Sequence, residues 1–220
     1  MKTAWERVEI ARNPNRKTSL DYVESIFDEF VELHGDRISK DDSAIVCGLA
    51  KIGNQNFTVI AGQKGRNTKE NIMRNFGMPN PESYRKAIRF IKQAEKFSRP
   101  IITFVDTKGA YPGIEAEEKG QGEAIAKSMF EMAKLKVPII TIVIGEGSSG
   151  GALAISIANK NNFKIIDKII EEKEEFEIVA KNMSQEILKL VNELNTMSKT
   201  EIIQHRYSKF RQIGDYKESN

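Results

Sequence analysis

Twice in this chain, a short apolar run ends in a glycine-rich loop that leads into a helical pattern. The first copy comprises residues 101–105, 106–113 and 120–136, and the second comprises 139–144, 145–151 and 152–158. Continuous apolar strands that alternate with helices are typical of parallel sheets with right-handed crossovers. Both loops then lie at the carboxyl ends of their strands, which is the edge where α/β sheets bind ligands.

The remaining patterns complete an α/β prediction. Apolar residues at helical spacing predict helices over 20–31 and 81–97, and two apolar runs flank Gly53-Asn54 as in a β-hairpin. After Lys160, residues 163–170 predict a further strand, and the charged tail has an apolar stripe that favours a helix. We expect three parts: an N-terminal helical segment at 1–36, a central domain at 37–170 and a C-terminal helical arm at 171–220.

Composition and charge exclude several classes of protein. The 220 residues carry 34 Lys and Arg against 31 Asp and Glu, so the net charge of +3 is too even to indicate a nucleic-acid-binding protein. The single cysteine, Cys47, excludes an intrachain disulfide framework and a cysteine-rich zinc site. The N-terminal residues lack an apolar signal core, and the aliphatic run at 137–144 is too short to span a membrane. We therefore expect a soluble cytoplasmic protein.

The second glycine loop matches two motifs that depend on side chains. Gly145, Gly147 and Gly150 have the spacing of a dinucleotide-binding loop, and Asp167 lies about where a ribose-binding acid is expected. The position of the motif argues against an NAD site, because a dinucleotide-binding loop normally opens the first βαβ unit and this loop follows the strand of the second predicted strand–loop–helix unit. The same loop contains G-x-S-x-G around Ser149, which with Asp167 and His205 has the chain order of a serine-hydrolase triad. His205 lies in a charged tail, however, which is typical of a surface histidine.

A third hypothesis needs no nucleophilic side chain. Gly150 and Gly151 precede an apolar helix, and glycines let a ligand oxygen approach the backbone closely. Free N–H groups at such a position favour negative charge that develops on an oxygen, as in an oxyanion hole. Because the first loop offers Gly109, Ala110 and Gly113 on the neighbouring strand, the two loops together predict one site.

The motifs also resemble those of a known family. DTKGAYPG (106–113), AEEKGQGEAIA (116–126) and VPIITIVIGEGSSGGALAI (137–155) closely resemble segments of the α subunit of the bacterial acetyl-CoA carboxylase carboxyltransferase. The resemblance extends to residues 20–37, 65–101 and 205–214, so it covers most of the chain. It implies a crotonase-like (ClpP/crotonase) ββα spiral fold with terminal helices.

The resemblance also implies a reaction and roles for residues. Members of the family transfer a carboxyl group from carboxybiotin to acetyl-CoA and form malonyl-CoA for fatty-acid synthesis. By the resemblance, the N–H groups of Gly150 and Gly151 stabilise the ureido oxygen of biotin. The carboxybiotin side of the cleft is then formed by Gly109, Ala110, Tyr111, Pro112, Gly113 and Ser149. Lys108 and Arg85 are candidate anion contacts, and the chain is expected to hold no metal.

Partners follow from the same resemblance. A β subunit is expected to complete the site, to carry the zinc of the complex and to assemble as two α with two β chains. A biotin carboxyl carrier protein and biotin carboxylase are the other expected partners. Membership of this complex would also link the chain to ATP and nucleotide binding. Propionyl-CoA as the acyl substrate, and a non-catalytic scaffold with a decayed site, stay open.

The sequence departs from the family in two places. Ser148 replaces a glycine of the family loop, and it would be strained if its φ angle were positive. After Lys160, a segment of a few dozen residues that family members contain is missing. Either this lineage has lost the segment or the 220 residues leave it out, and we favour the second explanation.

Overall fold

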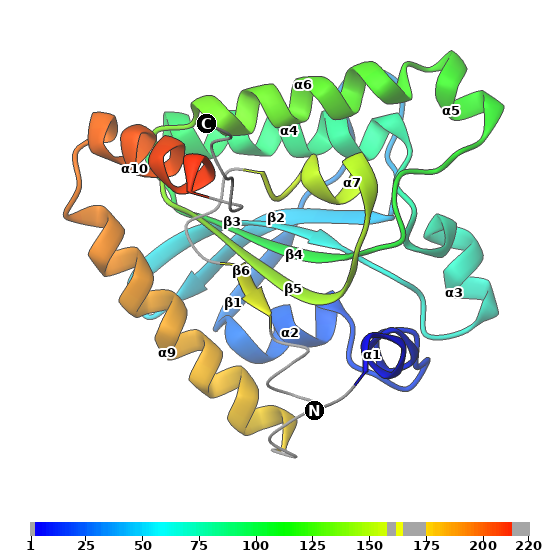
Figure 1. Ribbon diagram of the computed structural model, residues 1–220, viewed down its shortest axis with the longest axis horizontal. Coiled ribbons are helices and arrows are strands. Elements are labelled where there is room, and N and C mark those ends of the chain that lie inside the picture. Colours follow the sequence, from blue (N-terminus) through cyan, green and yellow to red (C-terminus); the bar gives the residue numbers. More distant parts are fainter. Residues whose placement is uncertain (1–2, 158–161, 165–174, 213–220) are drawn as a thin grey trace, which may run out of the picture.

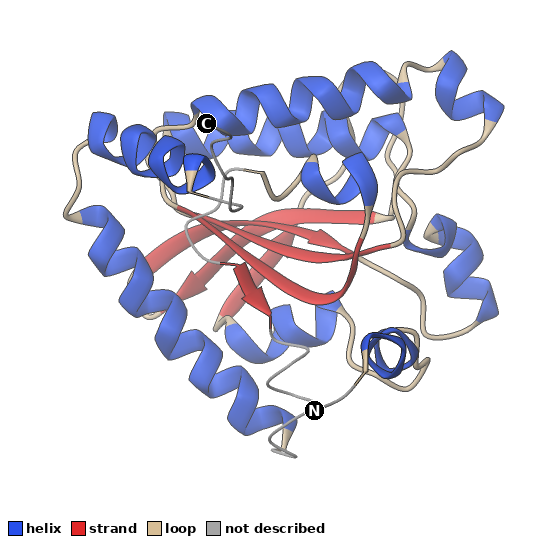
Figure 2. Ribbon diagram, in the orientation of Figure 1, coloured by secondary structure: helices blue, strands red, loops and turns tan. Residues whose placement is uncertain are grey.

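The computed structural model describes residues 3–157, 162–164 and 175–212. A mixed six-stranded sheet lies at its centre, with helices on both faces (Figures 1 and 2). The strands follow one another across the sheet in chain order: β1 (Glu29–Glu32), β2 (Ile45–Ile52), β3 (Gln55–Gly62), β4 (Ile101–Thr107), β5 (Ile139–Gly147) and β6 (Asn162–Lys164). The architecture is therefore α/β, as the sequence predicts.

The first half of the sheet is antiparallel and the second half is parallel. Ile52 pairs with Gln55, so the predicted Gly53-Asn54 hairpin between β2 and β3 is confirmed. From β3 onward each strand runs parallel to the next, with Ile101 opposite Ile139 where β4 pairs with β5. All seven residues of β4 are buried, as expected for a strand covered on both faces.

Two layers of helix cover the sheet. The helices are α1 (Ala4–Ala11), α2 (Ser19–Ile26), α3 (Thr68–Met73), α4 (Pro81–Lys96), α5 (Ile114–Glu118), α6 (Gln121–Lys134), α7 (Ser149–Leu153), α9 (Phe176–Asn195) and α10 (Lys199–Arg211). One core joins α2 and α9 to the sheet, and a second core joins α4, α6 and α7 to the other face (Figure 1). The predicted helices at 81–97 and 120–136 are confirmed as α4 and α6.

The predicted helix over 20–31 is wrong in its second half. Helix α2 ends at Ile26, and Phe27 adopts an extended conformation with φ −100° and ψ 140°. The chain then forms β1, in which Phe30 pairs with Ala50 of β2. Backbone pairing of β1 with β2 therefore outweighs the helical spacing of the apolar residues. Residues 1–36 thus contribute a strand to the edge of the sheet.

The helix predicted over 152–158 is wrong in its bounds. Helix α7 begins at Ser149 and ends at Leu153, so the glycine pair lies inside its first turn. β6 covers only the first part of the strand predicted at 163–170, and residues 165–170, including Asp167, lie outside the described residues. Lys160, where the family segment is expected to be missing, lies outside them too. The tail is helical as predicted, because α9 and α10 occupy it.

Candidate active site

The two glycine loops lie side by side at one edge of the sheet. Residues 108–113 link β4 to α5, and Ser148 links β5 to α7 (Figure 1). Because β4 and β5 are parallel neighbours, the two loops leave the sheet at the same end. The backbone N–H of Ser148 donates to the carbonyl oxygen of Thr107 at 3.3 Å and ties the loops together.

Gly151 is the point of closest approach between the loops. A Cβ atom at this position would lie 2.4 Å from the nitrogen of Ala110 and 2.8 Å from the carbonyl carbon of Gly109. The same atom would lie 2.7 Å from Oη of Tyr84. Gly109 itself has φ +137°, a backbone conformation that L side chains rarely adopt. The contact therefore requires glycine on both loops, and it brings Gly109, Ala110 and Gly151 together as the sequence predicts.

The first turn of α7 presents unused N–H groups. In an α-helix the first amides have no intrahelical acceptor, and the first bond here runs from Ala152 N–H to the carbonyl of Ser148 at 3.3 Å. Within the described residues, no hydrogen bond uses the amides of Ser149, Gly150 or Gly151. Ser149 is exposed, Gly150 is half-buried and Gly151 is buried, so the row of donors runs inward from the surface.

Backbone strain in this loop falls on Ser149. Ser148 has φ −113° and ψ 146°, which is ordinary extended backbone, so its replacement of the family glycine causes no strain. Ser149 has φ +63°, in the left-handed region. A non-glycine residue costs about 1 kcal/mol or more there. The strained residue thus directly precedes Gly150 and Gly151, whose amides are unused.

The side chain of Thr107 holds the backbone of the first loop through hydrogen bonds. Its buried hydroxyl accepts a hydrogen bond from Gly109 N–H at 3.0 Å and lies 2.6 Å from the carbonyl oxygen of Gly77. Farther along, Tyr111 N–H donates to the carbonyl oxygen of Pro79 at 3.0 Å. The segment that precedes α4 therefore positions the backbone of the loop.

Two buried polar residues near the loops were not predicted as site residues. Tyr84 of α4 is fully buried, and its hydroxyl has no hydrogen-bond partner among the described residues. Burial raises the pKa of this hydroxyl well above its usual range, so it stays a neutral donor. Gln121 donates from Nε2 to the carbonyls of Pro79 and Tyr111, and its Oε1 has no partner in the same part of the chain. The helical spacing marked Tyr84 only as a core residue.

The outer part of the first loop is open. Tyr111 and Pro112 are exposed, and a Cβ at Gly113 would lie 2.3 Å from the ring of Tyr111. Lys108 is exposed and precedes Gly109 in the chain, and its role as an anion contact stays a prediction. Arg85 does not join this group, because it donates to Asp36 Oδ2 at 2.9 Å and to the carbonyl of Lys119 at 3.1 Å.

The geometry does not fit a dinucleotide site. Gly145 and Gly147 belong to β5 itself, whereas that motif requires them in the turn after the strand. A Cβ at Gly145 would lie 2.1 Å from Oδ1 of Asp106, which is fully buried. This glycine therefore makes room for a carboxylate of the protein.

The hydrolase triad is wrong as well. Arg206, next to His205 on α10, donates to the carbonyl of Val137 at 3.3 Å, beside the amino end of β5. Ser149 follows the carboxyl end of that nine-residue strand. At about 3.3 Å per residue, the two ends lie roughly 25–30 Å apart, far beyond hydrogen-bonding reach. The remaining acid, Asp167, lies outside the described residues.

The described ranges contain neither a metal-binding cluster nor a membrane-spanning helix. No cluster of three or more His, Cys, Asp or Glu side chains there could hold a metal ion. None of the helices there is long and apolar enough to cross a membrane.

Comparison with known proteins identifies the family. Residues 2–163 match the family described as acetyl co-enzyme A carboxylase carboxyltransferase-like. The α subunit from Clostridium acetobutylicum is 45% identical, with 99% of this chain and 96% of that protein covered. The α subunit from a Geobacillus species is 46% identical, with 97% and 80% covered. In Clostridium tetani, a protein named as carboxyl transferase subunits beta/alpha is 43% identical, and the match covers 97% of this chain and 45% of that one.

Solved structures support the fold. Transcarboxylase 12S with hydrolysed methylmalonyl-coenzyme A bound has a TM-score of 0.54 at 22% identity, over 66% of this chain and 28% of that one. The β subunit of geranyl-CoA carboxylase from Pseudomonas aeruginosa has a TM-score of 0.56 at 19% identity, over 89% and 38%. The chain therefore has the crotonase-like carboxyltransferase fold, and it spans well under half of these two structures.

The length of the match bears on the segment expected after Lys160. The match to the Clostridium acetobutylicum protein spans 264 positions, so at least 44 of them have no residue in this 220-residue chain. The position of the missing segment after Lys160 stays a prediction. The comparisons do not support ATP binding by this subunit. On the length and identity of these matches, the chain belongs to the family of acetyl-CoA carboxylase carboxyltransferase α subunits, and it is a subunit of that enzyme.

Proposed function

We propose that this chain forms the carboxybiotin side of a carboxyltransferase site and stabilises the ureido oxygen of biotin through the amides of Gly150 and Gly151. The contact of Gly151 with Gly109 and Ala110 carries the proposal, because it places the unused amides of α7 beside the first loop. The exposed residues Tyr111, Pro112 and Ser149 would line the entrance for the biotin ring.

The chemistry needs donors for negative oxygen. When carboxybiotin loses its carboxyl group as CO2, the C–N bond breaks and the electron pair leaves negative charge on the ureido group. The departing biotin takes a proton from the methyl group of acetyl-CoA, and the resulting enolate carbon bonds to CO2 to give malonyl-CoA. Preorganised N–H groups stabilise such charge, and the loss of one donor typically costs about 3–4 kcal/mol.

The environments of Cys47 and His34 agree with a mechanism based on backbone donors. Cys47 is fully buried, and burial raises the pKa of its thiol to about 12, so it is not a nucleophile at neutral pH. His34 is bonded to Asp41 at 3.0 Å, in the connection that precedes β2. With biotin as the base, no protein base is required.

Partners complete the proposal. A β subunit is expected to bind acetyl-CoA, supply the oxyanion hole for its thioester and carry zinc, in an assembly of two α and two β chains. The Clostridium tetani protein, whose name joins both subunits, supports a close association. A biotin carboxyl carrier protein would deliver carboxybiotin formed by biotin carboxylase, in the cytoplasm.

Titration of a purified β subunit into this chain tests the proposal. The chain alone should not form malonyl-CoA from acetyl-CoA and carboxylated carrier protein. Activity should rise with added β subunit and saturate at an equal number of chains. A complex that forms but shows no turnover at any ratio would instead support a non-catalytic scaffold.

A pair of substitutions at Gly150 tests the amide itself. Gly150→Pro removes the N–H at the second helical position, which lies in the first turn and has no intrahelical acceptor. Gly150→Ala keeps the N–H, and its Cβ would meet only the Cγ2 methyl of Ile125 at 3.3 Å. We expect kcat to fall ~100- to 1000-fold for Gly150→Pro, and only a few-fold for Gly150→Ala. Equal kcat values for two folded variants would contradict a role for this amide.

A further inference from the structure

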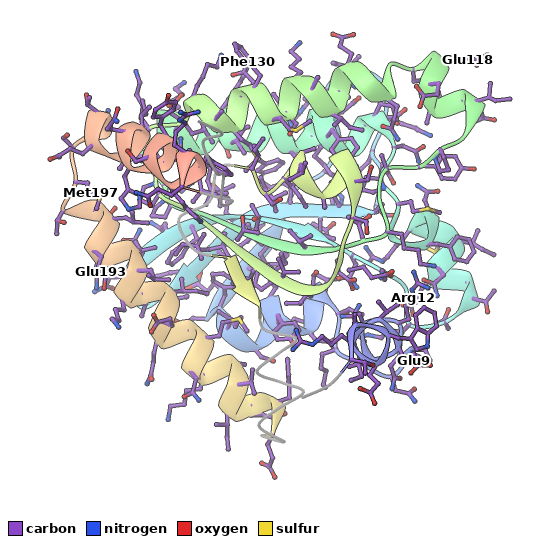
Figure 3. All side chains as sticks on the ribbon, viewed as in Figure 1. Glu9, Arg12, Glu118, Phe130, Glu193 and Met197 are labelled. Atoms are coloured by element: carbon purple, nitrogen blue, oxygen red, sulfur yellow. The ribbon has the colours of Figure 1, made fainter. Side chains whose placement is uncertain are left out.

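A polar hollow is lined in part by Lys108, the residue that precedes Gly109 in the first loop. Its volume is about 210 Å³, and it opens between the end of α1, the segment after β3 and the end of β5. Its charged lining residues are Arg12, Arg16, Lys64, Lys108 and Glu146. Figure 3 shows Arg12 at the end of α1, on the side that faces the sheet.

The acidic groups in this region are already paired. Lys64 Nζ lies 2.9 Å from Oδ1 of buried Asp106 and 3.0 Å from Oε2 of Glu146. Arg16 bonds to the other oxygen of Asp106, and Arg12 lies 2.9 Å from Oε1 of Glu146. Burial favours the neutral form of Glu146, but the hydrogen bonds from Arg12 and Lys64 hold its pKa below the usual range. The oxygens of both carboxylates are therefore paired with cations of the protein.

The neutral acceptors in the hollow are used as well. Oδ1 of Asn13 accepts from Asn15 N–H at 2.9 Å. Oδ1 of Asn71 accepts from Gly65 N–H at 3.1 Å. The amide nitrogens of both side chains are left as donors. The side-chain acceptors that line this hollow thus have partners within the protein.

Several donors are left over. Within the described part of the chain, Nζ of Lys108 and Nη1 of Arg12 have no hydrogen-bond partner. Counted with buried Asp106, the group holds four positive and two negative charges, a net charge of +2. A phosphoryl group carries close to −2 at neutral pH and offers several acceptor oxygens, so it matches both the charge and the donors.

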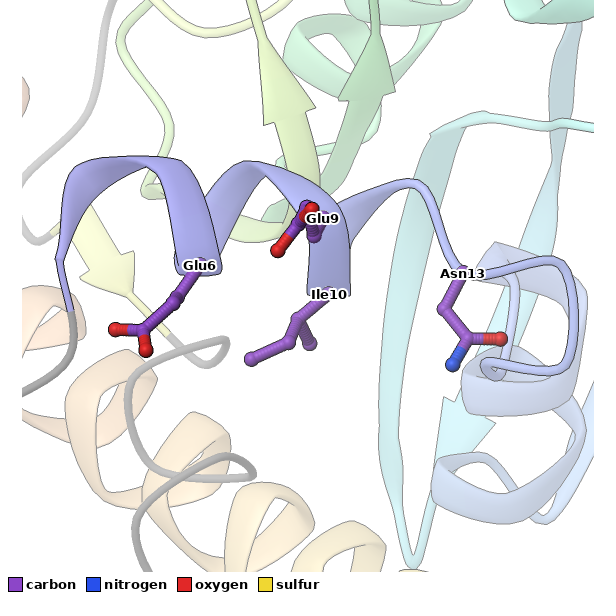
Figure 4. Close-up of a pocket in the computed structure, with 4 residues that line it drawn as sticks. All are labelled: Glu6, Glu9, Ile10 and Asn13. Atoms are coloured by element: carbon purple, nitrogen blue, oxygen red, sulfur yellow. The ribbon is translucent and has the colours of Figure 1, made fainter.

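A second hollow on α1 provides a contrast. It has about 300 Å³ and is lined by Glu6, Glu9, Ile10 and Asn13 along the helix (Figure 4). Its carboxylates already accept hydrogen bonds within α1 and its N-cap. Glu6 accepts from Thr3 N–H at 2.6 Å, and Glu9 accepts from Trp5 Nε1 at 3.1 Å. Negative charge repels an anion from this hollow, in contrast to the basic one.

The backbone beside the basic hollow is also unusual. Phe76, which lines it, has φ +54°, and the preceding Asn75 has φ +47°. Left-handed backbone at a bulky aromatic residue is rare. The strained turn holds the ring of Phe76 about half exposed at the wall of the hollow.

We propose that the hollow lined by Arg12, Lys64 and Lys108 binds a phosphoryl group. This site is separate from the proposed donors at Gly150 and Gly151, although Lys108 adjoins Gly109 in the first loop. The group has two chemical sources, the phosphates of coenzyme A and a free phosphate ion.

Calorimetric titration of the 220-residue chain with inorganic phosphate, at constant ionic strength, tests the proposal without any turnover. Lys108→Gln removes the exposed cation and leaves the buried ion pairs intact. Lys127→Gln, on an exposed position of α6, makes the same change of charge away from the hollow. We expect saturable binding that Lys108→Gln weakens ~10-fold and Lys127→Gln leaves unchanged.

Competition with coenzyme A separates the two sources. If coenzyme A displaces phosphate and Lys108→Gln weakens both ligands, the phosphoryl group belongs to coenzyme A. If phosphate binds and coenzyme A does not displace it, the ligand is a free phosphate. Absence of saturable binding, or equal affinities for the two variants, overturns the proposal. Because binding is measured on the chain alone, neither outcome depends on carboxyl transfer.

Discussion

At the scale of single residues, the glycines of the two loops have different physical roles. Gly151 gives space for Ala110, Gly145 gives space for Asp106, and Gly109 adopts a φ angle that other residues avoid. Gly122, in the first turn of α6, has no atom within 4 Å of an added Cβ and no positive φ. The same residue type is thus indispensable at some positions and dispensable at another.

Substitution of alanine at two glycines should separate these roles. Gly151→Ala places Cβ against backbone atoms of Gly109 and Ala110, so the loops must move apart. A displacement of about 1 Å at a reacting group costs on the order of 100-fold in kcat. Gly122→Ala should instead raise the free energy of unfolding by about 0.5–1 kcal/mol and leave kcat unchanged. Activity assays with the β subunit measure kcat, and urea unfolding measures the free energy of unfolding. A normal kcat for Gly151→Ala would refute the close contact between the loops.

At the scale of elements, the connection between β1 and β2 is fixed by one carboxylate. Asp36 is buried and accepts hydrogen bonds from Ile38 N–H at 2.9 Å and Ser39 N–H at 2.8 Å. Nε of Arg85 on α4 donates to the same side chain at 2.9 Å. Burial opposes ionisation, but these donors lower the pKa of Asp36 to about 2. The Asp36 side chain therefore links the β1–β2 connection to α4, which belongs to the core shared with α6 and α7.

The lowered pKa predicts how stability depends on pH. The unfolded chain binds a proton near the ordinary pKa of 3.8, above the folded value of about 2, so the stabilisation is present above pH 4 and is lost as pH falls toward 2. The wild type should lose about 1 kcal/mol more than Asp36→Asn between pH 5 and pH 3, because the variant lacks the titrating group. Urea unfolding of both proteins at pH 5 and pH 3 measures these free energies. Equal losses for the wild type and Asp36→Asn would contradict the prediction.

At the scale of the whole molecule, the C-terminal helices belong to the main body. Ile187, Leu190 and Val191 of α9 pack in the same core as α2 and the sheet strands. On α10, Arg206 donates to the carbonyl of Leu135 at 2.6 Å, where α6 leads toward β5. The sequence predicts a helical arm at 171–220, and its described helices, α9 and α10, lie along one side of the molecule, where α9 packs against the sheet (Figure 1).

A core substitution in α9 should therefore destabilise the entire chain. Leu190 is 5% exposed, and Leu190→Ala should lower the free energy of unfolding by about 2–5 kcal/mol in one transition. Ile178→Ala, on the same helix but 47% exposed, should change it by less than about 0.5 kcal/mol. Circular dichroism during thermal unfolding measures both, and a separate early transition in Leu190→Ala would indicate an independent arm.

The local sequence determined the two strand–loop–helix units, the edge of the sheet at which they meet and the candidates Gly109, Ala110, Gly150 and Gly151. Apolar periodicity and glycine act over a few residues, so these features can be read from adjacent positions. Only the tertiary structure decided that residues 29–32 form a strand and that Tyr84 lies against Gly151. It alone gathered Arg12, Lys64 and Glu146 into one hollow, because these residues lie 52 to 134 positions apart and no local pattern records which distant charges meet.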